Sequence, residues 1–594
     1  MTLQAHPPLR RIFARFFPRK YVLAQTEHAP VSDALSDEEK KETALRLTAQ
    51  AELALMQGNL AALSLFESAV RLDPMNPSIW LRQGLAFFEY GSEESKEKAL
   101  LLANKYFKHA TRLDPTLFEA WVGWGNTLLQ LGRFHEESHF HLEAKEKYQR
   151  AIALSSNQQA SVLYELYWDY GTACAEMAGH SGEALDQALA IEAFGKAIAL
   201  ELKPAPELLN QLAEAYLDMG LLVNDEIHFF NATRLIERSV QNEPRYIDGW
   251  MTLAEVHAQL YLNTLDEKHI AKASQGYSEA VKLAPKDPEG WLAWAQILAE
   301  SGRINEDPRM LHQSVEKCAR ASMLGDPNNP EIVAQWVESL SHLGVFTHRL
   351  DLLNEAQVKV EQATEEHPDD PDLWHAHGIC LGALAKYYEE PDLYEQAIDK
   401  MQTGLSYDRT SAEHWHSLAL LHAEYAHLTD SLDLWQRANR FFTKAIELKP
   451  ACPPLIFDAA HAHFMFSEAA SDLPALEQSI YLFETLLSQY RSVVLHHPEW
   501  LYGYASALDW LGEYTGEERH VLRAIELFSH VLLIEPDFAG IHHKMGRSYV
   551  QLGHLTNEPE FYRRGIGSFR LALRNNEEND GALLDWGICL IDLA

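Results

Sequence analysis

The segment 135–139 carries the residue types and spacing of a zinc-dependent hydrolase. It reads His-Glu-Glu-Ser-His. On one continuous helix, two histidines four positions apart bind zinc while the glutamate beside the first activates a water molecule. The segment falls in the turn region of a repeat described below, and no further histidine follows at the spacing of a larger zinc motif. We therefore expect no bound metal and keep a metal-dependent hydrolase as the alternative function.

Other catalytic and cofactor-binding patterns are absent from the sequence. It contains no GxSxG nucleophile turn and no GxxxxGK[ST] phosphate loop. Several histidine pairs have no common spacing with acids or cysteines, so we interpret them as helix-surface or interface residues: His375/His377, His414/His416, His461/His463 and His496/His497. No stretch outside the repeats is large enough for a catalytic domain. We expect no enzyme and no cofactor.

The composition narrows the choice of partner. The chain of 594 residues has a formal net charge of −36, and this argues against nucleic acid because phosphate backbones are bound by lysine and arginine. Basic protein segments are the favoured partners. The five cysteines stand singly, which predicts reduced thiols in a cytoplasmic protein. No apolar run is long enough to span a membrane.

Three kinds of marker recur along about 500 residues at a nearly constant step. The first is a small residue in the middle of each predicted first helix, spaced by 41 to 46 positions: Gly84, Gly125, Gly171, Ala213, Ala254, Ala295, Val337, Gly378, Ala419, Ala460, Ala505, Gly546 and Gly587. The second is a glycine seven positions later, which we place at the turn between two helices. The third is a proline at the end of each second helix, since proline cannot continue a helix. These markers predict a chain built of helix–turn–helix repeats.

The residues around the markers indicate how the helices pack. In six repeats a tryptophan lies four positions before the small residue. A bulky side chain one turn from a very small one allows two helices to approach closely. The second helices carry apolar residues at positions i, i+3 and i+4, as in the segment 280–285.

This pattern resembles the tetratricopeptide repeat, because Trp121, Gly125, Gly132, Tyr148 and Ala151 match its consensus in register. The resemblance implies an all-α, right-handed α-solenoid of about 13 helix–turn–helix repeats, and we expect it to be a bacterial variant. The usual unit has about 34 residues, whereas most units here have 41. The extra residues, such as 305–311 and 557–563, are predicted to lengthen the second helix by two turns. HEAT repeats have a similar period, but the Trp–Gly pair and the terminal proline favour the tetratricopeptide type.

Within the predicted insertions, Asp307 before Pro308 and Glu558 before Pro559 resemble an N-cap followed by a proline at the first helical position. The repeats are expected to occupy residues 41–594, with breaks near 155–166 and 484–495. Residues 1–40 lack the repeat and are expected to form a basic, disordered N-terminal segment. This segment either folds back on the acidic body or serves as an anchor to a membrane surface or a partner. The chain ends inside a first helix without a polar cap, which predicts either self-association through that end or a shortened chain.

In the repeat family that this chain resembles, ligands lie in a concave groove lined by the first helices. Between residues 165 and 338 the corresponding positions contain many acids and no lysine or arginine. They are Glu165, Asp169, Glu176, Glu207, Glu214, Asp218, Asp248, Glu255, Glu289, Glu300, Glu331 and Glu338. The inner members Glu214, Asp218, Glu255 and Glu338 lie beyond the first helical turn, where the helix dipole explains them poorly. They predict an acidic trough for a Lys/Arg-rich segment.

Farther along the chain, the predicted groove becomes aromatic, with Phe457, Phe464, Tyr502 and Trp510. Such rings are typical binding hot spots, and ordinary packing between repeats is the other interpretation. Taken together, these features predict a noncatalytic protein–protein interaction scaffold or chaperone that holds a segment of its partner in the groove.

Overall fold

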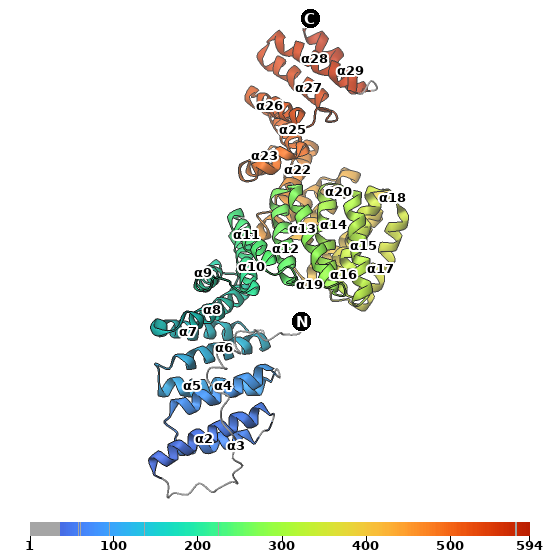
Figure 1. Cartoon of the computed structure of the whole chain (residues 1–594). Helices are drawn as coiled ribbons and strands as arrows, with labels where there is room; N and C mark the ends of the chain where they lie inside the picture. Colours follow the sequence, from blue (N-terminus) through green and yellow to red (C-terminus); the bar gives the residue numbers. More distant parts are fainter. Residues whose placement is uncertain are drawn as a thin grey trace. The chain divides into compact units, whose positions relative to one another are not determined.

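The computed structural model describes residues 36–57, 59, 61–93, 96–135, 137–223, 225–575 and 579–593. These residues form α-helices α2 to α29 and one short 3-10 helix, η1, and contain no strand (Figure 1). Thirteen helix pairs follow one another before the single last helix α29, so the predicted all-α array of about 13 repeats is confirmed. None of the described helices is both long and apolar enough to cross a membrane. The predicted N-terminal segment falls mostly outside the described residues.

The chain divides into two compact units, Met1–Leu253 and Ala254–Ala594. The division falls inside helix α12 (Ile247–Thr264), next to the marker residue Ala254, and the sequence did not predict it. The helices of unit 1 are α2 (Asp37–Met56), α3 (Ala62–Leu72), α4 (Pro77–Glu93), α5 (Glu97–Leu113), α6 (Phe118–His135), α7 (Ser138–Ala153), η1 (Ser155–Asn157), α8 (Ala160–Ser181), α9 (Ala184–Leu200), α10 (Pro206–Val223) and α11 (Glu226–Asn242).

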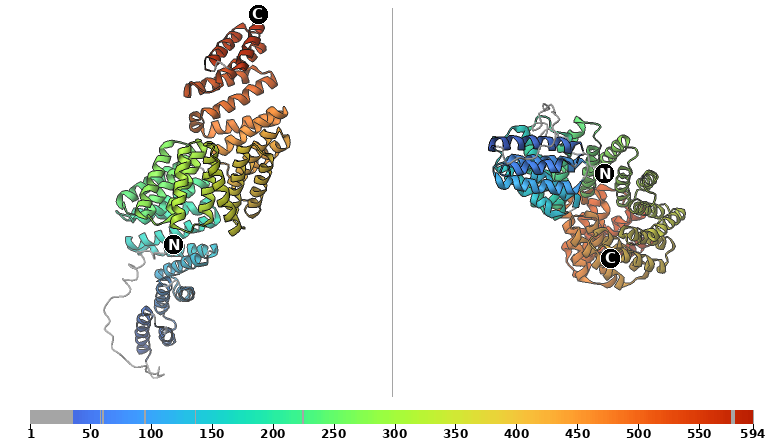
Figure 2. Two further views of the ribbon diagram at one scale, coloured as in Figure 1. Left: turned by 90° about the vertical axis from the view of Figure 1, so that its right-hand side faces the viewer. Right: turned by 90° about the horizontal axis from the view of Figure 1, so that it is seen from below.

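Unit 2 continues the same alternation of first and second helices (Figure 2). Its helices are α13 (Glu267–Leu283), α14 (Pro288–Ile304), α15 (Pro308–Leu324), α16 (Pro330–Phe346), α17 (Leu350–Glu366), α18 (Pro371–Tyr388), α19 (Pro391–Tyr407), α20 (Ala412–Thr429), α21 (Leu432–Leu448), α22 (Pro453–Ala470), α23 (Leu473–Gln489), α24 (Arg491–His496), α25 (Pro498–Thr515), α26 (Glu518–Ile534), α27 (Ile541–Thr556), α28 (Pro559–Asn575) and α29 (Asp580–Leu593).

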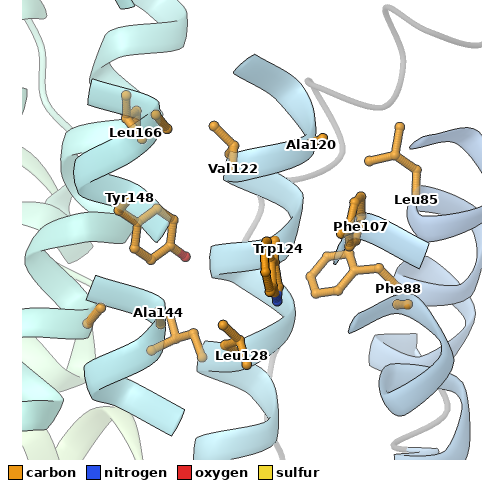
Figure 3. Packing of buried hydrophobic residues seen from close by; sticks show 14 of the residues in the cluster. Leu85, Phe88, Phe107, Ala120, Val122, Trp124, Leu128, Ala144, Tyr148 and Leu166 are labelled. Carbon is orange, nitrogen blue, oxygen red and sulfur yellow. The ribbon is translucent and has the colours of Figure 1, made fainter. Parts of the chain in front are cut away.

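The small residue in the middle of a first helix accommodates a large side chain from the second helix of the same repeat. A Cβ atom on Gly125 would lie 2.7 Å from the ring of Tyr148, and one on Gly171 would lie 2.5 Å from the ring of Phe194. Figure 3 shows Phe107 and Tyr148, the equivalent residues of two successive repeats, among the buried residues around α6. The predicted close approach is confirmed, and its partner is this aromatic residue of the second helix, 23 positions later.

The second glycine marker does not lie at the turn as predicted. Gly132, Gly302 and the other members of this set lie within the last turn of the first helix. A Cβ atom on Gly302 would lie 2.7 Å from Leu311, and one on Gly344 would lie 2.5 Å from Leu353, in each case nine residues later. These glycines therefore allow the second helix to start close against the first.

The repeated tryptophan fixes the loop that precedes its own helix. The indole Nε1–H of Trp121 donates to the carbonyl of Pro115 at 2.9 Å, and that of Trp374 donates to the carbonyl of Pro368 at 2.7 Å. Trp80 and Trp250 make the same bond to the proline six positions earlier. The proline marker thus ends one repeat, as predicted, and in these four repeats its carbonyl also anchors the next, whereas the indole Nε1 of Trp291 has no hydrogen-bond partner among the described residues.

The additional residues of the 41-residue unit lengthen the second helix, as predicted. The short first repeat has a second helix of 11 residues, α3, whereas the second helix of the long repeat at α15 has 17 residues. The predicted cap is confirmed at Asp307, whose side chain accepts from the amide of Arg309 while Pro308 occupies the first helical position. At the equivalent place in α28, the amide of Glu558 donates to the Thr556 hydroxyl.

Two short helices occupy the regions where the repeat spacing increases. The 3-10 helix η1 precedes α8, which has 22 residues and is the longest of the described helices. The six-residue helix α24 lies between α23 and α25. The additional residues are therefore accommodated as local insertions between helix pairs.

The two glycines at 171 and 195 allow a matched test of the packing rule. We expect Gly171→Ala to lower the stability of the chain by about 1–3 kcal/mol, because its methyl group would overlap the ring of Phe194. Gly195→Ala, on the second helix of the same repeat, would have no heavy atom within 4 Å and is expected to gain up to about 1 kcal/mol from helix propensity. Urea unfolding of both variants checks this, and equal effects would contradict it.

Candidate functional site: the acidic first-helix face

The division of the chain separates the predicted trough into two groups. Seven of its acids, from Glu165 to Asp248, belong to unit 1, and the five from Glu255 to Glu338 belong to unit 2. We therefore describe the acids of unit 1 and the acids of unit 2 as two separate faces. We use the name "acidic face of unit 1" for Glu165, Asp169, Glu207, Glu214, Asp218 and Asp248.

Polar pairs connect the first helices of neighbouring repeats in unit 1. The guanidinium of Arg133 donates to Glu176 from Nε at 2.6 Å, and Trp168 Nε1 donates to Gln211 at 2.6 Å. The partners in each pair are 43 positions apart, about one repeat. Glu176, which was predicted to line the groove, is thus largely committed to holding two repeats together, and His141 Nδ1 lies 3.1 Å from its second oxygen.

Asp169 lies at the centre of a buried polar network on this face. The Tyr148 hydroxyl donates to Asn126 Oδ1 at 2.7 Å, and the Asn126 side chain hydrogen-bonds Asp169. Burial raises the pKa of Asp169 to about 7, and the nearby charge of Glu165 adds to this, while Arg133 opposes it. An incoming cation would stabilise the charged form of this carboxylate.

The carboxylates on α10 and at the start of α12 form the rest of the face. Glu214 Oε1 accepts from Asn210 Nδ2 at 2.7 Å and from the Thr252 hydroxyl at 3.3 Å. Burial raises the pKa of Asp218, whose carboxylate accepts from Gln187.

Three carboxylates of this face act together on the pKa of the Tyr246 phenol. Burial is the largest cause of its raised pKa, and three members of the face, Asp248, Glu214 and Glu207, raise it further. These three carboxylates therefore produce a shared negative potential around a single phenol.

In unit 2 some acids of the predicted groove pair with side chains of the same unit. Arg303 forms a two-point hydrogen bond with Glu300 on the same helix, at 2.7 and 3.1 Å. Although burial opposes it, the pKa of Glu300 is lowered by Arg303 and also by His416 and Lys449. Since these last two residues come from helix α20 and the loop after α21, the first helix α14 faces α20 across the inside of unit 2.

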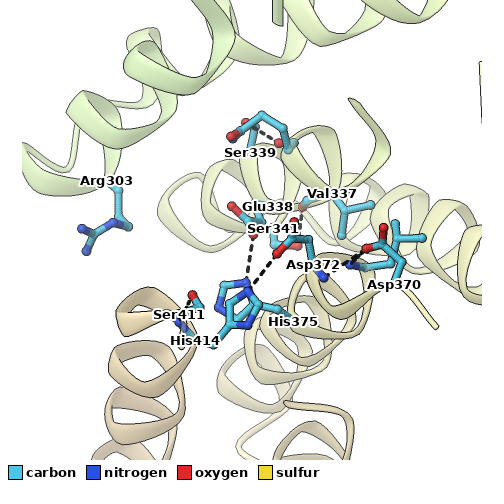
Figure 4. Close-up of polar contacts among 12 residues, drawn as sticks. Arg303, Val337, Glu338, Ser339, Ser341, Asp370, Asp372, His375, Ser411 and His414 are labelled. Carbon is cyan, nitrogen blue, oxygen red and sulfur yellow. Dashed lines mark hydrogen bonds and ion pairs between the residues drawn. The ribbon is translucent and has the colours of Figure 1, made fainter. Parts of the chain in front are cut away.

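Two histidines of unit 2 are held by carboxylates from neighbouring repeats (Figure 4). His375 Nδ1 lies 3.1 Å from Glu338, and His414 Nε2 lies 3.1 Å from Asp372. Their rings stack with centroids 4.3 Å apart. Glu338, a predicted partner-binding residue, therefore has an internal partner. The interpretation of these two histidines as interface residues is confirmed. In each pair the acid lies about one repeat before the histidine in the sequence, and this spacing could have predicted the pair.

Most of the predicted aromatic anchors fill spaces between repeats of unit 2. Phe464 is only 6% exposed. Phe457 stacks on Trp500 with centroids 4.9 Å apart, and Tyr502 packs against Phe528 and Phe538. Trp510 is partly exposed on α25.

Glu255, another predicted groove residue, lies close to Tyr277. Burial raises the pKa of the Tyr277 phenol, and the negative charge of Glu255 raises it further.

The segment 135–139 does not form one continuous helix. His135 ends α6 and His139 belongs to α7, with Glu137 preceding the start of α7. His135 lies 3.3 Å from Glu97, and His139 lies 3.0 Å from Glu137. Among the described residues there is no group of three or more histidine, cysteine or acidic side chains that could hold a metal ion.

The solved structures that this chain resembles, described below, are 13 to 17% identical to it. No family model and no curated protein matches the chain. Among solved structures, the C-terminal part of a TPR repeat-containing protein from Cytophaga hutchinsonii is 17% identical with a TM-score of 0.35, and covers 50% of this chain and 98% of its own. Cut9 with Hcn1 of the APC/C is 13% identical with a TM-score of 0.40, covering 94% and 97%. The human IFIT1 dimer with PPP-AAAA is 16% identical with a TM-score of 0.38, covering 76% and 90%.

Helix pairs repeating at 41 positions, a small residue under an aromatic side chain and a proline after each second helix define an α-solenoid. The chain is therefore an all-α array of helix–turn–helix repeats, and its sequence pattern resembles a lengthened tetratricopeptide repeat.

The raised pKa of Asp169 gives stability a measurable pH dependence. In the folded state this group holds its proton up to about pH 7, so the folded form binds more protons than the unfolded form between about pH 4 and 7, and stability falls as the pH rises through this window. Asp169→Asn is expected to raise the thermal midpoint at pH 8 relative to the parent chain and to change it little at pH 5.

The matched control for this prediction is Asp114→Asn. Hydrogen bonds from Thr116 lower the pKa of Asp114, so its ionised form stabilises the fold and its replacement is expected to lower the midpoint at pH 8. An Asp169→Asn variant that is equally stabilised at both pH values would contradict the assignment.

Proposed function

We propose that the chain is a noncatalytic scaffold or chaperone that holds a basic segment of a partner protein along the acidic face of unit 1. The observation that carries this proposal is the charge of the face: it has six carboxylates, and from Pro204 to Thr233, where Glu207, Glu214 and Asp218 lie, the chain has neither lysine nor arginine. A segment rich in lysine or arginine would restore charge balance there.

The electrostatics of individual residues support the same partner. Asp169 has a raised pKa because burial and Glu165 disfavour its charge, and a bound ammonium or guanidinium group would reverse both effects. The carboxylates around Tyr246 already repel the ionised form of that phenol. A cation arriving at this face would thus gain interactions with several carboxylates at once.

The inner side of unit 2 is a poorer receptor for a basic segment. Its acids Glu300, Glu338 and Asp372 are already paired with Arg303, His375 and His414 respectively. A basic partner would have to displace the Arg303 guanidinium from Glu300 and compete with the histidine contacts of Glu338 and Asp372. We therefore assign partner binding to unit 1.

The cysteines fit a reducing compartment, and the cytoplasm is our proposed location. All five are free thiols, and Cys174, Cys318, Cys380 and Cys589 are buried. Free buried thiols in a chain of this length need no oxidising environment to fold.

Fluorescence anisotropy of a labelled lysine-rich peptide tests this function. We expect the full chain to bind the peptide at low salt and the double variant Glu207→Gln/Glu214→Gln to bind it about tenfold more weakly, since two charge-assisted contacts are lost. The matched control is Glu146→Gln/Glu192→Gln, which removes the same charge from exposed positions on the second helices α7 and α9. Binding should also weaken as salt rises.

Two results would contradict the proposal. One is binding that resists high salt. The other is equal weakening by both double variants, which would show that the peptide responds to the total charge of the chain and not to this face.

A further inference from the structure

Unit 1 exposes a dense apolar patch where α10 meets α11. Leu221, Leu222, Val223, Ile227 and Phe230 are 52, 46, 45, 57 and 52% exposed, and we call these five residues the α10–α11 patch. They lie within ten positions of the chain. The other exposed large apolar residues described in unit 1, such as Leu101 and Leu185, have no such grouping. Contiguous exposed patches of this kind mark binding surfaces.

The surroundings of the patch specify the chemistry of whatever covers it. Asp225 and Glu226 are exposed beside the apolar side chains, and Asp218 lies one turn before them on α10. The Asp225 carboxylate accepts from the amide of Ile227 at 3.0 Å and therefore stays next to the patch. An occupant must combine apolar side chains with positive charge.

One segment of the same chain has this combination. Residues 9–21 read LRRIFARFFPRKY, with five basic residues, no acid, and Ile12, Phe13, Phe16 and Phe17 between them. They lie outside the described residues. The five acids between residues 204 and 233, namely Glu207, Glu214, Asp218, Asp225 and Glu226, match the five cations in number.

We propose that residues 9–21 dock on the α10–α11 patch of their own chain. The phenylalanine side chains would cover the patch, and the arginine side chains would pair with the bordering carboxylates. Burial of two or three such rings and the charge complementarity together favour this occupant over an acidic or purely polar one.

The connection is long enough for docking within one chain. Tyr21 and Ser36, the first described residue, are 15 positions apart, so the link between them spans at most about 50 Å. Helix α2 and helix α10 are four repeats apart, which at about 10 Å between neighbouring first helices is about 40 Å. Ser36 precedes the start of α2 whereas the patch lies at the end of α10, so the length of a first helix, about 27 Å, adds to this separation. The link therefore reaches the patch when it is nearly fully extended.

This inference goes beyond the proposed function, because it holds whether or not a partner protein binds. The patch is apolar and lies at the turn between α10 and α11, whereas the acidic face extends from α8 to the start of α12. Glu214 and Asp218 belong to the acidic face and also lie on α10, which carries part of the patch. The docked segment would thus compete with a basic partner for part of the face.

Photo-crosslinking from inside the segment tests this docking directly. In the full chain, Phe16→p-benzoylphenylalanine is expected to form a crosslink within one chain to residues 218–230, seen as a band of monomer size and located by mass spectrometry. Adding Leu222→Ser and Phe230→Ser should reduce the yield severalfold. Leu101→Ser, at an exposed leucine of α5 outside the patch, should leave it unchanged, and circular dichroism confirms that all variants are folded.

Several outcomes would overturn the docking proposal. They are crosslinks only between two chains, crosslinks to other parts of the array, and no crosslink from position 16 or from position 13. A crosslink to the patch that disappears when anionic phospholipid vesicles are added, with the segment captured by lipid at physiological salt, would assign the segment to a membrane surface instead. Failure of the lysine-rich peptide to bind would leave this crosslink unaffected, so the two proposals are separable.

Discussion

The array depends on one contact seen at Gly84, Gly125, Gly171, Gly378 and Gly546, the close approach of a first and a second helix over a residue with no side chain. At Gly125 or Gly171 the space of a single methyl group is occupied by an aromatic ring from the second helix. Because this contact fixes the rotation of both helices about their axes, it also determines which residues of the first helix are left on the outer surface. The charged face that we propose as the binding site is a consequence of that packing.

What differs along the chain is how the surface carboxylates are used. In unit 2 Glu300 pairs with Arg303, Glu338 with His375 and Asp372 with His414. In unit 1 several acids remain close to one another, and the raised pKa of Asp169 reports the cost of burying that charge. The same repeat architecture therefore gives unit 2 carboxylates with partners in the same or a neighbouring repeat. It gives unit 1 a group of carboxylates on neighbouring first helices.

Much of the fold could be predicted from the sequence, because its markers act locally. Proline ends a helix wherever it occurs, and the lengthening of the second helix follows from counting residues between fixed markers. The second glycine was placed at the turn, but it lies in the last helical turn, since its role is to admit Leu311 or its equivalent from the next helix. Only the three-dimensional arrangement of the helix pair shows that requirement.

The candidate site could be predicted in charge but not in detail. The acidic positions were identified by their place in the repeat, yet nothing local shows that Glu176 is bonded to Arg133 or that Phe464 is buried by its neighbours. Those facts depend on residues one repeat away. The division at residue 253 is likewise a property of long-range packing, because the markers Trp250 and Ala254 around it match those of the other repeats.

The central claim is that the acidic face of unit 1 receives cations from a partner, and carboxyl footprinting tests it most directly. The carboxylates of the full chain are modified with a carbodiimide and an amine, with and without the lysine-rich peptide, and modification is measured at each residue by mass spectrometry. The account predicts that the peptide protects Glu207, Glu214 and Asp218. Protection confined to Glu300, Glu338 and Asp372 of unit 2, or the absence of any protection at saturating peptide, would contradict it.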